Sequence, residues 1–219
     1  MRQNYGPKLD EFRAKVMAWY CVHGRDFPWR HAETCYQRVI GELLLQRTQA
    51  NTVARFYHSF LAKYPSWDSL SEAKEEDLQE VLRNIGLWRR RARNLIDLAS
   101  SVKEMGGQLP NTRDELERLP GVGQYMASAI LVLCYGEKES LLDVNMARVL
   151  ERVFGPRCLA DIRYDPYLQA LARSTVQGDD AREANWAILD LAATTCLSAR
   201  PKCLECPVAQ ICSFAGQSD

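Results

Sequence analysis

The chain has 219 residues, 47% of them hydrophobic, and its 28 basic side chains balance its 28 acidic ones. This length can bury one large core or two smaller helical ones, and the zero net charge excludes a generally polycationic protein. Any affinity for nucleic acid must therefore come from local patches. The N-terminus lacks an apolar secretory signal and no stretch is suited to span a membrane. We expect a soluble protein of the cytoplasm or nucleoid, without a membrane partner.

The hydrophobic pattern predicts helices almost throughout and no strand of useful length. The predicted helices cover residues 8–23, 36–48, 52–64, 66–70, 75–82, 94–105, 111–118, 126–135, 144–153, 165–176 and 182–195. After the first of them, Phe27 and Trp29 mark a break in the pattern. We interpret these two aromatic side chains as packed under a loop rather than as base-stacking groups. The sequence thus indicates an all-α fold.

Glu42 lies among the apolar residues of the second predicted helix, flanked by Gly41 and three leucines. Burying an ionised carboxylate without a partner is costly. Glu42 therefore either faces solvent on the polar side of its helix, or lines a pocket with a raised pKa suited to proton transfer.

Four arginines fall within residues 89–93, directly after the segment Ile85-Gly86-Leu87-Trp88 with its glycine turn. Such a charge run is usually a solvated face. Beside a glycine turn, however, it is also suited to binding phosphate, and the sequence leaves both interpretations open.

The most informative stretch is 119–145, which begins Leu-Pro-Gly-Val-Gly-Gln-Tyr between two predicted helices. Gly121 and Gly123 lack a Cβ atom, so the backbone of another molecule can approach closely. The amides of Val122, Gly123 and Gln124 would face outward at the start of the second helix. Such amides form an anion site that suits a DNA phosphate. The alternative is an ordinary tight connection between two core helices.

Asp143 stands between an apolar pair and the next predicted helix, in Leu-Leu-Asp-Val-Asn. An acid in that position is usually an N-cap. A catalytic role is the second interpretation, and it depends on the cysteines near the C-terminus.

Eight cysteines would suit four disulfides in a secreted protein, but four of them crowd into the last 24 residues and no secretory signal is present. In a reducing compartment this crowding favours a metal site over disulfides. These four, called here the C-terminal cysteine set, have the spacing C-x6-C-x2-C-x5-C. They are Cys196, Cys203, Cys206 and Cys212.

Four thiolates can hold zinc tetrahedrally or a [4Fe–4S] cube, and the spacing alone accepts both. A redox-active C-x-x-C pair is a third option, which the two additional cysteines and the absence of a preceding strand disfavour. The other four cysteines lie among apolar residues, and we expect them to be buried small hydrophobes. They are Cys21, Cys35, Cys134 and Cys158.

Five motifs occur in a fixed order along the chain. They are Gly-Glu-Leu-Leu-Leu-Gln-Arg-Thr-Gln at 41–49, Ile-Gly-Leu at 85–87, Leu-Pro-Gly-Val-Gly at 119–123, Leu-Asp-Val-Asn at 142–145 and the C-terminal cysteine set. Together they resemble the helix-hairpin-helix, Gly/Pro-Asp superfamily of DNA glycosylases, in its iron–sulfur branch. The resemblance covers residues 25–212 and favours a [4Fe–4S] cluster over zinc.

The resemblance implies two helical lobes. One would comprise residues 27–137 and carry the hairpin in a six-helix lobe. The other would join residues 1–26 to 138–219 around the cluster. A substrate base would flip into the cleft between the lobes.

Matching by position implies roles for three residues. Asp143 matches the family's catalytic aspartate, whose carboxylate stabilises positive charge on the sugar or orients water as the N-glycosidic bond breaks. Glu42 matches a glutamate with which adenine-specific mismatch glycosylases protonate the leaving purine. Tyr125 stands where the bifunctional members, similar to endonuclease III, have a lysine. Because tyrosine cannot form a Schiff base, we expect a monofunctional enzyme.

The combination of Glu42, Tyr125 and Asp143 with a short C-terminus looks most like the thymine glycosylases that act on G:T and G:U mismatches. In that group the tyrosine lies against the flipped pyrimidine. Adenine removal from A:G or A:8-oxoguanine mispairs is the alternative. It is disfavoured because adenine-specific members have a small residue at the Tyr125 position and an additional domain that senses 8-oxoguanine. A non-catalytic module that binds DNA and senses damage is a further alternative.

The same matching implies the DNA contacts. Gln46 or Arg47, together with Leu87, would fill the gap left by the flipped nucleotide, although Leu87 also suits a helix-capping hydrophobe. The hairpin amides at Val122 and Gly123 would hold a phosphate, with a monovalent cation bound by hairpin carbonyls. We expect the partner to be double-stranded DNA containing a mismatch, and the protein to be a monomer.

Overall fold

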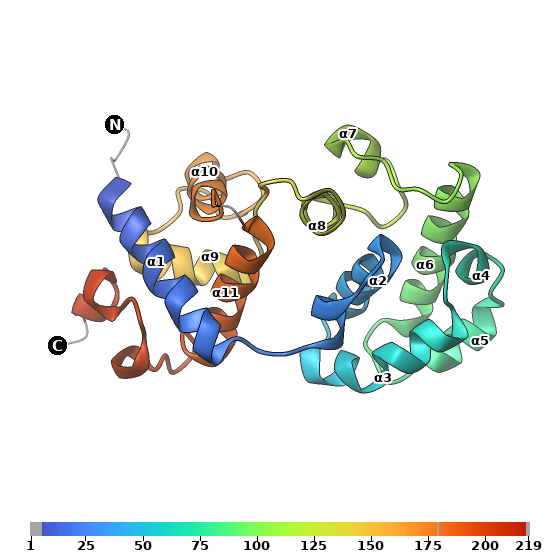
Figure 1. Ribbon diagram of the computed structural model, residues 1–219, viewed down its shortest axis with the longest axis horizontal. Coiled ribbons are helices and arrows are strands. Elements are labelled where there is room, and N and C mark those ends of the chain that lie inside the picture. The colour runs from blue at the N-terminus through green and yellow to red at the C-terminus, as the bar shows by residue number, and fades with distance from the viewer. Residues whose placement is uncertain (1–5, 179, 218–219) are drawn as a thin grey trace. The chain divides into compact units, whose positions relative to one another are not determined.

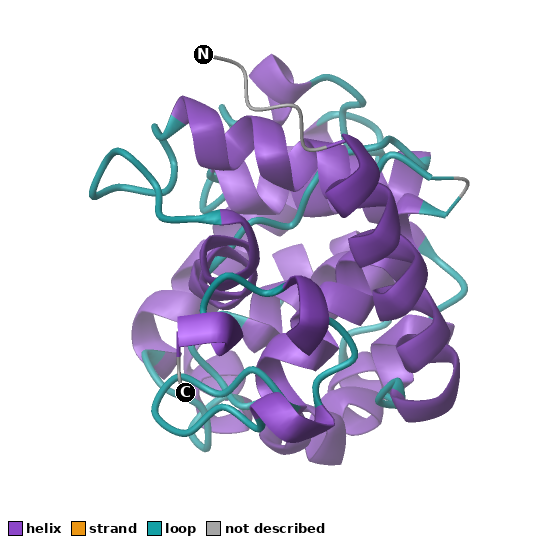
Figure 2. Ribbon diagram, turned by 90° about the vertical axis from the view of Figure 1, so that its left-hand side faces the viewer, coloured by secondary structure: helices purple, strands orange, loops and turns teal. Residues whose placement is uncertain are grey.

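The computed structural model describes residues 6–178 and 180–217 (Figure 1). Within these ranges all regular structure is helical and no strand is present (Figure 2). The expected all-α class is therefore confirmed. Residues 1–5, part of the segment in which the sequence shows no secretory signal, lie outside the described part of the chain. No helix in the described ranges has the length and apolar character needed to cross a bilayer.

The chain divides into two compact units, each described by its own residues. The first, called here the hairpin unit, is the continuous segment Asp26–Tyr135. The second, called the cysteine unit, joins Met1–Arg25 to Gly136–Asp219. Each unit has its own cluster of buried hydrophobic residues, and the two clusters share no residue. Each unit therefore buries its own apolar surface.

The hairpin unit consists of one short 3₁₀-helix and a series of α-helices. They are η1 (Pro28–His31), α2 (Cys35–Leu45), α3 (Ala50–Lys63), α4 (Trp67–Ser71), α5 (Glu75–Val81), α6 (Trp88–Glu104), α7 (Arg113–Leu116) and α8 (Gln124–Tyr135). A capping box begins α2, in which the Thr34 hydroxyl accepts from the Gln37 amide and the Gln37 side chain accepts from the Thr34 amide. Helices α2 and α8 pack against one another, and α4 and α5 pack on α6.

Close packing explains the break after the first predicted helix. Phe27 and Trp29 are both buried, and their rings stack with centroids 4.7 Å apart. On α2, Gly41 permits this arrangement, because a Cβ atom there would lie 2.6 Å from the Cβ atom of Trp29. The interpretation of these aromatic side chains as packed under a loop is confirmed.

The cysteine unit contains α1 (Gly6–His23), α9 (Val144–Phe154), α10 (Pro166–Thr175), α11 (Ala181–Thr194) and three short 3₁₀-helices. The latter are η2 (Cys203–Glu205), η3 (Ala209–Ile211) and η4 (Ala215–Gln217). Helix α1 packs on α10 and α11, and α9 packs on the same two helices. A salt bridge joins the segment just after α1 to α11, since Arg25 Nε lies 2.7 Å from the fully buried carboxylate of Asp190 on α11.

Asp165 caps α10 from a fully buried position. Its carboxylate accepts hydrogen bonds from the amides of Leu168, Leu159 and Cys158 at 2.6–2.7 Å. Burial by itself raises the pKa of this carboxyl, but the backbone donors outweigh burial, and the pKa of Asp165 is lowered. The charged cap therefore holds the segment before α10 in place.

Several predicted helix boundaries are wrong, and α6, for example, begins at Trp88 rather than at residue 94. Two further differences occur where the chain turns. The helix predicted over 36–48 ends at Leu45, because Gln46 leaves the helical region and Arg47 adopts a φ of 54°. The helix expected over 111–118 is reduced to the four residues of α7. In both places the chain turns sharply instead of continuing its helix.

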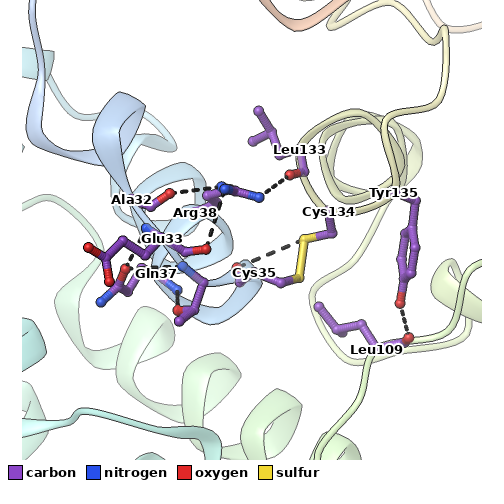
Figure 3. Close-up of a disulfide and its surroundings, with 10 residues drawn as sticks. Ala32, Glu33, Cys35, Gln37, Arg38, Leu109, Leu133, Cys134 and Tyr135 are labelled. Atoms are coloured by element: carbon purple, nitrogen blue, oxygen red, sulfur yellow. Dashed lines mark hydrogen bonds between the residues drawn. A yellow bond between two sulfur atoms is a disulfide. The ribbon is translucent and has the colours of Figure 1, made fainter.

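The expectation that four scattered cysteines are buried small hydrophobes is wrong. Cys35 and Cys134 form a disulfide with their Cα atoms 5.1 Å apart (Figure 3), and Cys21 and Cys158 are exposed. The disulfide joins the first residue of α2 to the last turn of α8, across 99 positions of sequence. Beside it Arg38 donates to the carbonyls of Ala32 and Leu133, at 3.1 and 2.9 Å (Figure 3).

Candidate functional site

A phenol and a carboxylate meet inside the hairpin unit. Tyr125, in the first turn of α8, donates from its hydroxyl to Oε2 of Glu42 on α2, at 3.1 Å. The side chain of Glu42 belongs to a residue that is only 6% exposed, so its interpretation as a solvent-facing group is wrong. A buried carboxylate needs a hydrogen-bond partner, and the Tyr125 hydroxyl provides one for Glu42. The pair is a candidate centre for binding a base or moving a proton.

The glycine hairpin between α7 and α8 uses its two glycines differently. Gly121 has a φ of 74°, a left-handed conformation that side chains other than glycine rarely adopt. Gly123 has no such requirement, and a Cβ atom built there would meet nothing within 4 Å. Gly121 therefore shapes the turn, whereas Gly123 leaves open space where another molecule's backbone can approach.

The expected row of outward amides at the hairpin is only partly correct. The Val122 amide donates to the Leu119 carbonyl at 3.1 Å, and the Val122 side chain is buried. This amide is therefore used inside the turn. Helix α8 starts at Gln124, and the first amides of a helix have no acceptor within it. The anion site is better sought at Gly123 and the first turn of α8 than at Val122.

A pocket of about 270 Å³ opens on the hairpin unit. Three segments of chain form it: the end of α2, the start of α6 and the glycine hairpin. Its lining includes Gln46, Arg47, Leu87, Arg90, Asn94 and Gly121. The fold thus brings four of the predicted DNA-contact residues to one concave surface, although they come from distant parts of the sequence.

Two residues at this pocket have left-handed backbones without being glycine. Arg47 has a φ of 54° and Leu87 a φ of 59°. Each such conformation costs about 1–3 kcal/mol and is concentrated at functional sites. Leu87 occupies the N-cap position of α6, as the helix-capping interpretation expected, yet it is 55% exposed. An exposed leucine on a strained turn is suited to contact a ligand.

The arginine run after Gly86 does not form one charged surface. Arg89 lies over the ring of Trp88 at 3.8 Å, and Arg93 pairs with Glu75 at 3.2 Å. Arg91 is buried, and burial lowers the pKa of its guanidinium. The phosphate-facing interpretation therefore does not hold for the run as a whole, because the buried Arg91 is not part of any surface, whereas the exposed Arg90 lines the pocket.

In the cysteine unit Asp143 is the N-cap of α9, as its position before a helix predicted. Oδ1 accepts from the amides of Asn145 and Met146 at 2.9 and 2.8 Å, and Oδ2 accepts from the Asn145 side-chain amide at 2.6 Å. A carboxylate has about four acceptor positions, so these three donors hold it in one orientation without exhausting it.

A chain of hydrogen bonds runs from this carboxylate to the C-terminal cysteine set. Asn145 Oδ1 accepts from Nη1 of Arg148 at 3.1 Å. The same arginine donates to the carbonyls of Ala192 and Cys196, each at 2.9 Å. The orientation of Asp143 is thereby connected to the backbone of the first cysteine in the set.

The C-terminal cysteine set lines a single cavity of the cysteine unit. Its members are free thiols, and Arg152 Nη1 lies 3.3 Å from Cys196 Sγ. Burial raises the pKa of the Cys206 thiol to about 11. Among the described residues no group of three or more His, Cys, Asp or Glu is placed to hold a metal ion. The donor set nevertheless suits a thiolate-ligated group, because four thiols and a guanidinium donor converge on one cavity.

Residues 40–161 match a family described as HhH-GPD superfamily base excision DNA repair protein. This segment includes Glu42, Tyr125 and Asp143. The chain belongs to the HhH-GPD superfamily.

Similarity to known glycosylases extends along almost the whole chain. A thymine/uracil-DNA glycosylase of Pyrobaculum aerophilum is 38% identical, over 95% of this chain and 94% of its own length. The adenine DNA glycosylase of Homo sapiens is 33% identical, over 94% of this chain and 39% of its own length. The structure of a thermostable thymine-DNA glycosylase has a TM-score of 0.90 at 32% identity, covering 96% of this chain and 98% of that one. The expected helix-hairpin-helix glycosylase fold and base excision repair function are confirmed.

Sequence reasoning did not predict the contacts that Arg91 and Arg148 make in this HhH-GPD glycosylase. The spacing of Asn145 and Arg148, three residues apart on a predicted helix, offers a signal for their contact. Nothing in the sequence connects Arg148 with the Cys196 carbonyl, or the Arg91 side chain with the end of α2. These contacts join segments whose neighbourhood depends on helix packing.

Proposed function

We propose that this base excision repair glycosylase hydrolyses the N-glycosidic bond of thymine or uracil mispaired with guanine, without cleaving the strand. The hydrogen bond between Tyr125 and Glu42 carries the proposal. A phenol stands where the bifunctional relatives have a nucleophilic amine, and its oxygen is engaged with a buried carboxylate. The named activity of the Pyrobaculum aerophilum relative and of the thermostable thymine-DNA glycosylase supports the same substrate.

The Tyr125–Glu42 pair suits a pyrimidine. The extruded base lies against the Tyr125 ring, since every base has a face that stacks on an aromatic side chain. Thymine and uracil share an imide N3–H, and a carboxylate oxygen of Glu42 accepts it. Adenine has no N–H donor on the ring nitrogens of its pairing edge, so it cannot make this contact through a ring nitrogen.

Asp143 stabilises the sugar as the base departs. Breaking the N-glycosidic bond builds positive charge on the sugar, and a preoriented carboxylate lowers the energy of that state. The three N–H donors on Asp143 keep the carboxylate from rotating, and a remaining acceptor position is available to the sugar or to the attacking water. Asn145 and Arg148 act as positioning residues for it.

Extrusion of the base depends on the pocket of the hairpin unit. Leu87 and either Gln46 or Arg47 enter the gap that the flipped nucleotide leaves. Phosphate binds at Gly123 and the first amides of α8, where backbone can approach closely. A mismatch lowers the cost of extrusion because its pairing is already weak. The enzyme acts as a monomer on double-stranded DNA, and we place it in the cytoplasm or nucleoid.

The C-terminal cysteine set holds a [4Fe–4S] cluster in this proposal, through Cys196, Cys203, Cys206 and Cys212. When bound, the cluster supplies a structural cross-link between the loop segments. Arg152 Nη1 lies 3.3 Å from Cys196 Sγ and so provides a hydrogen-bond donor beside one of the four sulfur ligands. An anaerobic preparation that is colourless and contains zinc without iron would overturn this part.

A panel of mismatched oligonucleotides tests the substrate. Duplexes with G:T, G:U, A:G or A:8-oxoguanine are incubated with enzyme and then either heated in alkali or left untreated. We expect alkali-dependent product from G:T and G:U, and none from untreated samples. Product only from the adenine-containing pairs would reject the proposal.

Adenine removal remains the second candidate because Glu42 is a buried carboxylate and the human adenine DNA glycosylase is 33% identical. Asp143→Asn keeps the side-chain shape while removing the charge. The variant should lose most activity on whichever substrate the panel identifies. Unchanged turnover would leave Asp143 as an N-cap only.

A further inference from the structure

Arg91 begins in the first turn of α6, but its guanidinium lies inside the hairpin unit, and the residue is only 8% exposed. Nη1 donates to the carbonyls of Leu43 and Leu44, the latter at 3.4 Å. Nη2 donates to three further oxygens, at 2.6, 3.2 and 3.3 Å. These belong to the carbonyls of Gln46 and Gly86 and the hydroxyl of Thr48.

The acceptors lie at two places that the sequence separates widely. Leu43, Leu44 and Gln46 provide carbonyls at the C-terminal end of α2, which no later helical amide can satisfy. Gly86 provides the carbonyl directly before Leu87. One side chain therefore binds the backbone on both sides of the pocket.

Each of these places carries a strained residue. Gln46 precedes Arg47 and Gly86 precedes Leu87, and both of the following residues have positive φ. Such conformations persist only where the surrounding structure fixes them. The Arg91 amide also donates to the Leu87 carbonyl at 2.9 Å. Arg91 thus contacts the strained turns through its backbone and its side chain.

We propose that Arg91 is a positioning residue that holds the Arg47 turn and the Leu87 turn together, so that the groups entering the DNA are assembled before DNA binds. The inference rests on the proposed role of Leu87, and of Gln46 or Arg47 in the other turn, in filling the gap left by the extruded nucleotide. Assembly in advance removes the entropic cost of ordering two separate turns during extrusion.

The chemistry of this position requires arginine. The guanidinium is planar, and its two terminal nitrogens here serve acceptors on different segments at the same time. Lysine has one ammonium group and cannot span them. Although burial lowers the pKa of Arg91, arginine keeps its charge at any pH at which the enzyme works, so the donors are permanent.

Arg91→Lys tests the proposal with the full-length enzyme. A duplex carrying a G:U mismatch with 2-aminopurine next to the uracil reports extrusion by its fluorescence, and a single-turnover assay follows excision. We expect extrusion and excision to be about tenfold or more slower, in line with hydrogen bonds to a charged group. The defect should shrink on a duplex whose uracil lies in an unpaired bubble, because extrusion there costs little.

Arg38→Lys is the matched control, since the Arg38 guanidinium belongs to the same unit and also donates to backbone carbonyls on two segments. These are the carbonyl of Ala32, just after η1, and that of Leu133, in the last turn of α8. It should lower the Tm as Arg91→Lys does, but extrude the base normally. Equal extrusion by Arg91→Lys and the wild type would overturn the proposal, as would an equal loss in Arg38→Lys.

Parallel variants separate this inference from the proposed function. Normal extrusion by Gln46→Ala, Arg47→Ala and Leu87→Ala would show that the gap-filling role itself is wrong. Slow extrusion by Leu87→Ala and by Gln46→Ala or Arg47→Ala, with normal extrusion by Arg91→Lys, would refute only the positioning role. Should Arg91→Lys be too unstable to assay, Thr48→Val removes one Nη2 acceptor at constant shape. About threefold slower extrusion is then expected, and no change would overturn the proposal.

Discussion

The Tyr125 hydroxyl donates to the Glu42 carboxylate at 3.1 Å, although 83 positions of sequence separate the two residues. The contact exists because α2 and α8 pack against one another with opposite directions. At the far end of the same helix pair, the disulfide joins Cys35 to Cys134 and Arg38 donates to the Leu133 carbonyl (Figure 3). The disulfide and the Arg38 hydrogen bond thus join α2 and α8 at one end of the pair, and the candidate base-contacting groups lie at the other.

Tyr125→Phe and Glu42→Gln test this pair. Removing the phenol oxygen deprives a buried carboxylate of a donor, and removing the charge deprives the base of its acceptor. We expect the single-turnover rate of each variant on a G:T or G:U duplex to fall about 10- to 100-fold. The double variant should be little worse than either, because contacting residues are not additive.

Tyr36→Phe is the control for this pair. Tyr36 is a buried tyrosine of the same unit and donates to the Tyr64 carbonyl at 2.6 Å, but it is not part of the proposed site. It should lower the Tm and leave the rate unchanged. Rates for Tyr125→Phe that match Tyr36→Phe would remove Tyr125 from the chemistry.

Tyr125→Lys should gain strand cleavage. An amine at this position can attack the sugar and form a Schiff base, which the phenol cannot do. The expected observation is a borohydride-trapped covalent adduct with mismatched DNA, together with product that forms without alkali. If no adduct is trapped from a folded variant, the residue does not face the sugar.

Asn145→Ala should slow excision by reducing the restraint on Asp143. The variant removes the donor to Oδ2 and the acceptor of Arg148, and we expect about a tenfold loss in single-turnover rate. The control is Asp180→Ala, which removes the cap of α11 and costs about 1 kcal/mol of stability. It should keep the wild-type rate, and a similar loss in both variants would indicate a general destabilisation.

The two hairpin glycines should respond differently to alanine. Gly121→Ala places a side chain at a φ of 74° and should destabilise the fold by about 1–2 kcal/mol. Gly123→Ala should keep its Tm, since the added Cβ meets nothing within 4 Å, but bind mismatched duplex about tenfold or more weakly. Thermal melting and fluorescence anisotropy measure the two effects. Wild-type affinity of Gly123→Ala would place the phosphate elsewhere.

Reduction of the Cys35–Cys134 disulfide should destabilise the hairpin unit. The bond closes a loop across 99 positions of sequence, and a disulfide contributes about 2–4 kcal/mol. Cys35→Ser should lower the Tm to the same extent with or without reductant. The exposed cysteines supply the control, because Cys21→Ser and Cys158→Ser should leave the Tm unchanged. A wild-type Tm that is insensitive to reductant, in protein shown by mass to be reduced, would contradict the assignment.

Local signals in the sequence determined the helical class, most of the element positions and the superfamily. Apolar residues at helical spacing predict each helix from a window of a few turns, and an acid before α9 predicts its N-cap. Motifs in fixed order, from Gly41 to Cys212, indicate the glycosylase fold because each motif is read within a few residues.

The tertiary structure alone decided the long-range partners of Glu42, Arg148 and Cys35. Glu42 finds its donor across 83 positions, Arg148 finds the Cys196 carbonyl across 48, and Cys35 finds Cys134 across 99. Within the arginine run, the Arg91 side chain lies inside the hairpin unit and donates to the Leu43 and Gln46 carbonyls at the end of α2. Contacts at such separations depend on how whole helices pack. A single sequence contains no local trace of that packing, because the energy that drives it comes from apolar area buried without regard to direction.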